Sequence, residues 1–154
     1  MKKLLLALLM PALVISCADQ QKKETEKNDG PVIQGTWRLL SGTLIEKGDT
    51  AVTDYTKTMS FIKIINDTHF AFLKHDLNKG KDSTASFGAG GGSYVLKGNE
   101  YTEHLEYCND REWEGHDFTF TVTISNDTLV QSGVEKIEAQ GIERYNIEKY
   151  IRVR

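Results

Sequence analysis

The alternation of residues 118–124, Phe-Thr-Phe-Thr-Val-Thr-Ile, most constrains the fold of this chain. The apolar side chains of this run share one face of an extended strand and the threonines share the other, because successive side chains of a strand point to opposite faces. One face is then buried and the other meets water, which is typical of an antiparallel sheet. The run therefore predicts a half-buried antiparallel strand.

Further short runs rich in Val, Ile, Thr, Phe and Tyr alternate with turn residues, and no long helical periodicity interrupts them. We expect strands at residues 33–46, 58–65, 68–75, 90–97, 100–108, 117–124, 128–132 and 148–153. Residues 134–147 fit a long loop, a short helix or an extra strand. So many strands joined by short turns favour a single up-and-down antiparallel β-barrel of about 8–10 strands with little helix, because closure removes the exposed edges of a sheet. The predicted fold class is all-β.

The first 17 residues, MKKLLLALLMPALVISC, have the order of a secretory signal, with two lysines before a short apolar run. That run is too short for a permanent membrane-spanning helix. The ending, in which Ser16 precedes Cys17, resembles the bacterial lipobox, whose cysteine is lipidated and begins the mature protein. The resemblance implies a signal peptide at residues 1–16 and lipidation at Cys17. It places the protein in the bacterial cell envelope, on the periplasmic or the surface face of the outer membrane.

Residues 18–30 contain one apolar side chain and predict a flexible tether. The expected organisation is a lipidated cysteine and tether at residues 17–31 and one domain at residues 32–154. The signal holds two of the 19 basic side chains, so 17 basic and 22 acidic residues leave a net charge of −5. An acidic surface excludes a typical nucleic-acid partner. It also argues against docking on anionic lipid, so the expected membrane link is the acyl chains on Cys17.

Lipidation of Cys17 would leave Cys108 without a partner and exclude an intramolecular disulfide. We interpret Cys108 as a small apolar core residue rather than a nucleophile, because the neighbouring Glu106 and Asp110 disfavour a thiolate.

The sequence Gly35-Thr36-Trp37 near the start of the first expected strand resembles the motif of lipocalins and related calycin barrels. The stretch GGGSYVLKGNEYTEHLEY, with IINDTHFAF before it and EKYIRV at the end, looks like the lipocalin-like domain proteins of Bacteroidetes, many of which are lipoproteins. The resemblance covers residues 33–154. It implies a barrel with Trp37 plugging its closed end and an arginine of the last strand packed across that ring, Arg152 before Arg154. The family implies fold and location far more than activity.

Tyr101, Glu103, Leu105 and Tyr107 share one face of an expected strand. If that face points inward, a carboxylate lies between two phenols and orients a ligand in a mostly apolar cavity. If it points outward, Glu103 faces solvent. The predicted ligand-binding residues are Tyr101, Glu103, Tyr107, Phe70, Phe72 and Trp113. Each aromatic ring among them fits plain core as well, and Trp113 fits either a cover over one barrel end or an exposed contact.

No metal or cofactor site is predicted. His104 and Glu106 share a face, yet no spacing supplies the third ligand that catalytic zinc needs. A haem site would need His75 or His104 inside the barrel mouth. The G-x-S-x-G and H-E-x-x-H motifs are absent from the sequence, and we do not expect an enzyme.

The preferred interpretation is a monomeric, lipid-anchored barrel that binds a small, largely apolar molecule without transforming it, as a carrier, scavenger or sensor. A second is a packed barrel that serves as a scaffold, with loops 47–57, 77–89 and 109–116 contacting another envelope protein. The weaker alternatives are a haem-binding barrel and an acid–base enzyme that uses Glu103 with Tyr101 or Tyr107.

Overall fold

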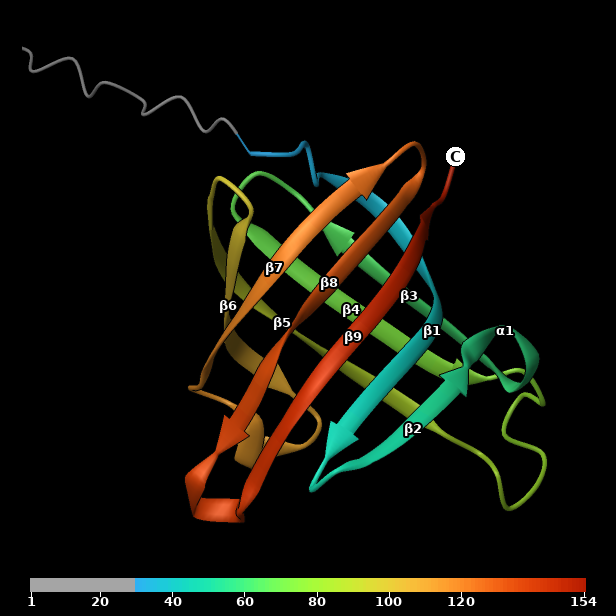
Figure 1. The fold of residues 1–154 in the computed structure, drawn as a ribbon. Coiled ribbons are helices and arrows are strands. Elements are labelled where there is room, and N and C mark those ends of the chain that lie inside the picture. The colour runs from blue at the N-terminus through green and yellow to red at the C-terminus, as the bar shows by residue number, and fades with distance from the viewer. Residues whose placement is uncertain (1–29) are drawn as a thin grey trace, which may run out of the picture.

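The computed structural model describes residues 30–154, so the expected signal peptide and lipidation at Cys17 lie outside the described residues. Nine antiparallel strands run through the described part (Figure 1). Their bounds are β1 Gly35–Glu46, β2 Asp49–Asp54, β3 Met59–Ile65, β4 His69–Asp76, β5 Phe87–Lys97, β6 Glu100–Cys108, β7 Asp117–Ser125, β8 Thr128–Ile137 and β9 Ile142–Arg152. Helix α1 spans Tyr55–Thr58, and the 3-10 turns η1 and η2 span Arg111–Trp113 and Glu138–Gln140. No helix in this part of the chain is long and apolar enough to cross a membrane.

Eight of the strands close into a barrel. From β3 to β9 each strand pairs with the next one along the chain. β9 then pairs with β1, from Trp37 opposite Arg152 to Ile45 opposite Tyr145, and β1 pairs with β3 through Gly35 to Arg38. The predicted all-β, up-and-down antiparallel barrel is confirmed.

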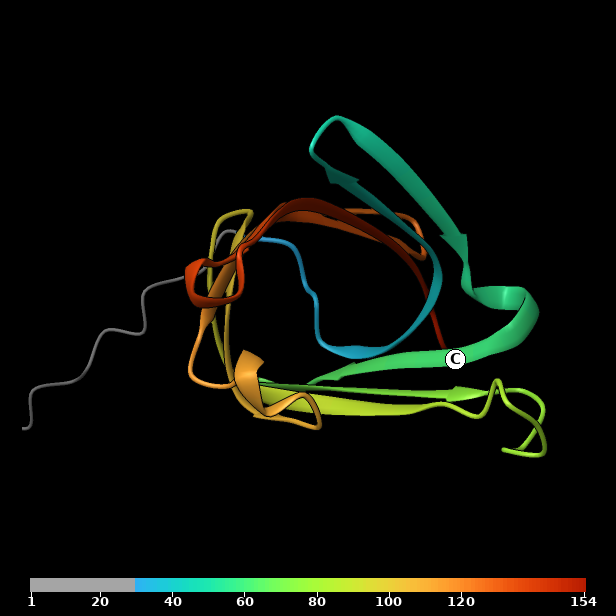
Figure 2. The same ribbon diagram turned by 90° about the horizontal axis from the view of Figure 1, so that it is seen from below.

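β2 lies outside the closed barrel. It pairs only with β1, over Ser41 to Glu46, and all six of its residues are exposed. Figure 2 shows the β1–β2 hairpin leaning away from the barrel wall. The sequence predicted a loop at 47–57. Lys47 and Gly48 both adopt positive φ, which a two-residue hairpin turn requires. The chain therefore turns back at these residues, and β2 pairs along β1.

Residues 134–147, left open by the sequence, complete a long β8–β9 hairpin. The hairpin reverses through η2 and through Gly141, which is left-handed with φ 65°. Glu135 and Asn146 are polar yet buried inside the barrel, and they interrupt the apolar alternation that would have marked these strands.

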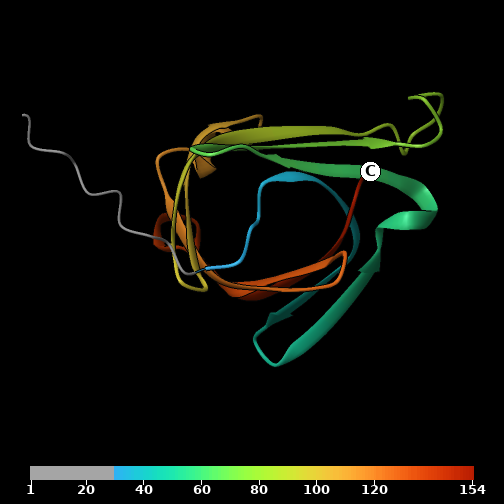
Figure 3. The same ribbon diagram turned by 90° about the horizontal axis from the view of Figure 1, so that it is seen from above.

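The N-terminal segment closes one end of the barrel. It crosses that end before entering β1 (Figure 3), and Ile33 and Trp37 are completely buried there. The indole nitrogen of Trp37 donates to the carbonyl of Ile33 at 2.7 Å. The guanidinium carbon of Arg152 lies 4.0 Å from the centre of the Trp37 ring, which is the contact that the resemblance implies. Arg152 also donates to the carbonyls of Gln34 at 2.7 Å and Val32 at 3.3 Å, so β9 holds the segment in place.

Glycine is required at position 35, beside the contact between Arg152 and Trp37. Its φ of +134° belongs to glycine, and a Cβ added there would lie 2.6 Å from Nη1 of Arg152. The Gly-x-Trp motif therefore provides both the ring and the space for the arginine.

Candidate ligand-binding cavity

A cavity of about 510 Å³ occupies the half of the barrel away from the N-terminal segment. Its wall includes residues from the loops and strand ends at the end viewed in Figure 2, where the β4–β5 and β6–β7 connections lie. A volume of this size is typical of small-molecule sites. The interior of the barrel is therefore open at one end and packed at the other.

Lys63 lies at the boundary between the cavity and the packed half. The residue is only 4% exposed, and β3 directs its side chain inward between Phe61 and Ile65. Its ammonium donates to Oε1 of Glu103 at 2.6 Å and to Oε1 of Gln131 at 3.0 Å. Burying a charge is costly unless it is paired and hydrogen-bonded, and both conditions are met here.

Three aromatic rings surround the same ammonium. The Lys63 nitrogen lies 5.5 Å from the ring centre of Phe70, 5.8 Å from that of Tyr101 and 5.6 Å from that of Tyr150. These are cation–π distances. The lysine thus supplies a fixed positive charge beneath the cavity, held by a carboxylate, an amide and three rings.

Glu148 faces the cavity beside this cluster. The hydroxyl of Tyr150 donates to its Oε2 at 2.7 Å, and no cation of residues 30–154 forms an ion pair with it. Burial raises the pKa of Glu148, the charge of Lys63 and the Tyr150 hydrogen bond oppose that shift, and the charges of Glu103 and Glu135 add to it. Glu148 is the carboxylate of the cavity interior that lacks a counter-ion within the described chain.

A second polar group lies nearer the mouth. Nε of Arg144 donates to Oε2 of Glu135 at 2.6 Å, and Nδ2 of Asn146 donates to Oε1 of the same carboxylate at 2.8 Å. The guanidinium of Arg144 also lies 5.0 Å from the ring centre of Trp113. Each oxygen of Glu135 therefore has a donor.

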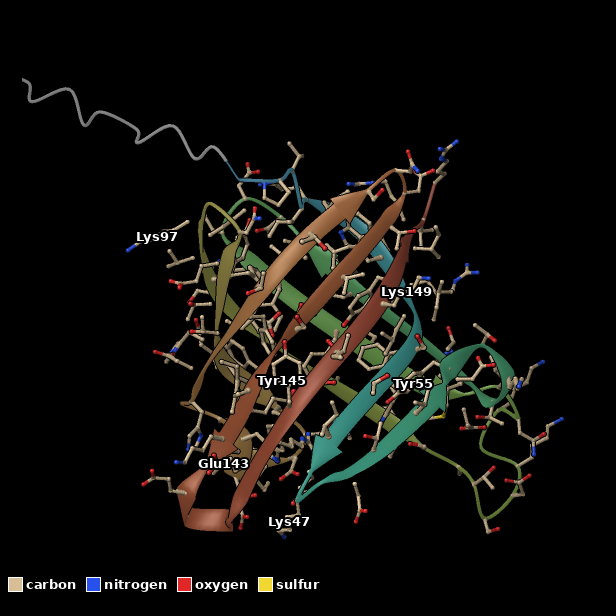
Figure 4. All side chains as sticks on the ribbon, in the orientation of Figure 1. Lys47, Tyr55, Lys97, Glu143, Tyr145 and Lys149 are labelled. Atoms are coloured by element: carbon tan, nitrogen blue, oxygen red, sulfur yellow. The ribbon has the colours of Figure 1, made fainter. Side chains whose placement is uncertain are left out.

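Aromatic and aliphatic side chains form part of the cavity wall, beside its polar groups. Tyr55, labelled in Figure 4, reaches from α1 to Gly42 of β1 and packs edge-on against Phe61, with ring centres 5.7 Å apart. Trp113 packs against Phe118 at 5.6 Å. The other apolar side chains of this wall are Leu44, Phe72, Leu105 and Phe120. A ligand in the cavity therefore contacts apolar surface as well as the charged groups.

The structure brings most of the predicted ligand-binding residues together, in different roles. Glu103 points inward, as one of the two readings of its strand required, and lines the cavity with Phe72 and Trp113. Phe70 and Tyr101 lie deeper, in the core beneath Lys63. Trp113 is half-buried and packs on the core at the cavity mouth.

Tyr101 carries a hydroxyl that has no hydrogen-bond partner in the described structure. The residue is completely buried beside the carboxylate of Glu103. Burial raises the pKa of Tyr101, and the charge of Glu103 raises it further. The phenol stays protonated and neutral.

The structure places Tyr107 outside the predicted ligand-binding site. It is 69% exposed on the outside of the barrel and does not line the cavity. Gly91 pairs with Tyr107 while Gly92 pairs with Leu105, so Glu106 is an extra residue that forms a β-bulge. The bulge reverses the inward and outward alternation after Leu105, and Cys108 lines the cavity where Tyr107 was expected.

Both histidines considered for haem lie outside the barrel. His75 and His104 are exposed, and Nδ1 of His104 lies 2.5 Å from Oδ1 of Asp117 on the outer surface. Within residues 30–154, no group of three or more His, Cys, Asp and Glu side chains could hold a metal ion.

Sequence reasoning missed Lys63, Gln131 and Glu148. Lys63 had a visible signal, because it interrupts the apolar positions Phe61 and Ile65 of a strand with period two. No sequence signal marked Glu148, because its lack of a counter-ion depends on how the neighbouring charges pair in the folded barrel.

No protein-family model matches this chain, and no curated protein matches its sequence. The likeness to calycin barrels rests on the closed eight-stranded antiparallel barrel and on the contact between Trp37 and Arg152.

Proposed function

We propose that this protein binds a small amphipathic molecule in its barrel without transforming it, as a carrier, scavenger or sensor in the bacterial envelope. The observation that carries the proposal is a cavity of about 510 Å³ lined by aromatic and aliphatic side chains together with buried charged groups. Small-molecule sites typically combine an apolar lining with a few convergent polar groups that fix orientation.

The charged inner end narrows the expected ligand from largely apolar to amphipathic. Lys63, Glu103 and Gln131 satisfy one another, so a ligand does not need to pair with them. Glu148 still presents accessible surface to the cavity. A wholly apolar ligand would remove water from this carboxyl and return no hydrogen bond, which is unfavourable.

The open interior favours ligand binding over a purely structural barrel. A scaffold needs only a packed core, and packing a barrel solid is more stabilising than leaving a void. The exposed hairpin β1–β2 gives a protein partner a place to bind, but it does not account for the cavity.

Binding of a fluorescent probe tests the proposal. The purified protein should enhance the fluorescence of 1-N-phenylnaphthylamine, and Leu44→Trp should weaken that binding because Leu44 lines the cavity. Thr43→Trp is the matched control, because Thr43 points to the opposite face of the same strand. Equal binding by both variants would place the probe outside the cavity and contradict the proposal. Native mass spectrometry of protein from its own host should show a co-purifying small molecule.

The envelope location rests on the lipobox resemblance and has its own test. Cys17→Ser should move the protein from the membrane fraction to the soluble fraction, while Cys108→Ser should leave it in the membrane fraction. Retention of Cys17→Ser in the membrane would contradict the lipid anchor.

A further inference from the structure

We infer that the ligand carries one protonated amine and that Glu148 is the counter-ion that receives it, an inference that rests on the proposed ligand binding. Three features of the cavity support it: the pairing of its charged side chains, the free oxygen of the Glu148 carboxyl, and the aromatic and aliphatic side chains of its wall.

Of the four carboxylates that line the cavity, those of Glu103 and Glu135 are paired, that of Asp110 is exposed, and that of Glu148 has no counter-ion within residues 30–154. Glu103 pairs with Lys63 at 2.6 Å and Glu135 pairs with Arg144 at 2.6 Å. Glu148 pairs with no cation of the described chain. Lys74 also lines the cavity, but it lies at the mouth, where a Cβ on Gly88 would be 3.1 Å from its Cε.

The unpaired carboxyl has a free side. Tyr150 donates to Oε2 of Glu148, and Oε1 accepts no hydrogen bond within residues 30–154. A buried carboxylate without a counter-ion favours proton uptake, and burial does raise the pKa of Glu148. A ligand ammonium supplies the missing positive charge and at least one N–H donor, and so replaces that proton.

The alternative head groups fit the cavity less well. A carboxylate or phosphate at the inner end would lie against Glu148 and would have to draw Lys63 away from Glu103 and Gln131, because Lys74, the cavity cation without an ion pair in the described chain, lies at the mouth. A neutral polar group would leave Glu148 without a counter-ion. A cationic group supplies the counter-ion that Glu148 lacks within the described chain.

The apolar part of the cavity wall indicates the rest of the ligand. Phe61, Phe72 and Trp113 offer ring surfaces and Leu44 and Leu105 offer aliphatic ones along the path to Glu148. An aromatic or branched apolar body joined to an amine by a short chain spans these two regions. The inferred class is therefore a small monoamine with an apolar body.

A set of three ligands that share one body tests the head group. Tryptamine, the neutral tryptophol and the anionic indole-3-acetate are titrated calorimetrically into the purified protein. The wild type should bind tryptamine about tenfold or more tightly than tryptophol, as one additional charge-assisted contact predicts, and indole-3-acetate most weakly. Glu148→Gln should reduce the preference for tryptamine severalfold and leave tryptophol affinity nearly unchanged.

Glu143→Gln is the matched control. Glu143 lies on the same strand, is labelled in Figure 4 at the edge of the molecule, and is exposed beside Lys136. This variant should keep the wild-type preference for tryptamine. If it loses the preference as fully as Glu148→Gln does, general electrostatics explains the binding and the inference is overturned.

The remaining outcomes separate the inference from the proposed function. Three results would overturn the inferred amine and still leave the cavity as a ligand site. They are equal affinity for tryptamine and tryptophol, tighter binding of indole-3-acetate, and binding of the naphthylamine probe without binding of any of the three indoles. Failure to bind the probe as well overturns the proposed function. If Glu148→Gln does not fold, a crystal structure of the wild-type tryptamine complex decides: the ammonium should contact the Glu148 carboxylate, and contact elsewhere overturns the inference.

Discussion

The ammonium of Lys63 and the carboxylate of Glu103 meet at 2.6 Å inside the barrel, and both residues are less than a tenth exposed. A buried ion pair contributes little net stability, because desolvation offsets the attraction between its charges. The pair does fix the position of a charge at the inner end of a cavity. Its presence there is a structural reason to regard the cavity as a polar recognition site.

Replacing one partner of this ion pair should lower the free energy of unfolding far more than replacing both partners. Lys63→Met leaves Glu103 charged, buried and unpaired, and we expect a loss of about 3–5 kcal/mol in the free energy of unfolding. Adding Glu103→Leu should recover a large part of that loss. Urea denaturation of the single and double variants measures both values, and equal destabilisation of the two would contradict the argument. The exposed pair Lys136–Glu143 provides the control, since Lys136→Met should change stability little.

Arg152 should stabilise the fold more than Arg154, the other arginine at the C-terminal end. Arg152→Ala removes the contact with the Trp37 ring and two hydrogen bonds to the segment that closes the barrel, and we expect a loss of about 2–3 kcal/mol. Arg154→Ala is the control, because its ion pair with Asp127 is exposed. Guanidinium denaturation compares the two variants. Similar midpoints for both would mean that the Trp37 contact does not hold the barrel end closed.

The closed end of the barrel could be predicted from the sequence, whereas the residues of the cavity could be predicted only in part, for a physical reason. Trp37 and Arg152 belong to short motifs at the two ends of the domain, and a closed barrel brings those ends together. The face of Tyr107 depends on a bulge in a neighbouring pair of strands, which alternation within one strand does not reveal. Lys63 and Glu148 lie on strands that are not adjacent, so their relation depends on the register of the whole barrel.

The β-bulge itself depends on Gly92. A Cβ there would collide with the backbone carbonyl oxygen of His104 on the paired strand, and backbone does not yield easily. Gly92→Ala should therefore lower the thermal midpoint strongly or prevent folding. Gly88→Ala on the same strand is the control, since its Cβ would meet the flexible end of Lys74 at 3.1 Å. Circular dichroism on heating compares them, and a smaller loss for Gly92→Ala than for Gly88→Ala would contradict this role.

Glu148 should make the fold less stable as the pH rises. Its folded-state pKa is raised above 4.5 by burial, so the folded protein binds this proton more tightly than the unfolded chain does. The contribution of Glu148 to the free energy of unfolding then falls as the pH rises from 4.5 through the folded-state pKa, whereas Gln has no proton to lose. The stability of Glu148→Gln minus that of the wild type should increase over this window and level off above it. Asp76 and Glu106, whose pKa values hydrogen bonds lower, titrate in both proteins and cancel in the difference. Urea denaturation from pH 4 to pH 8 measures the difference, and a constant value across that range would show that Glu148 has no raised pKa.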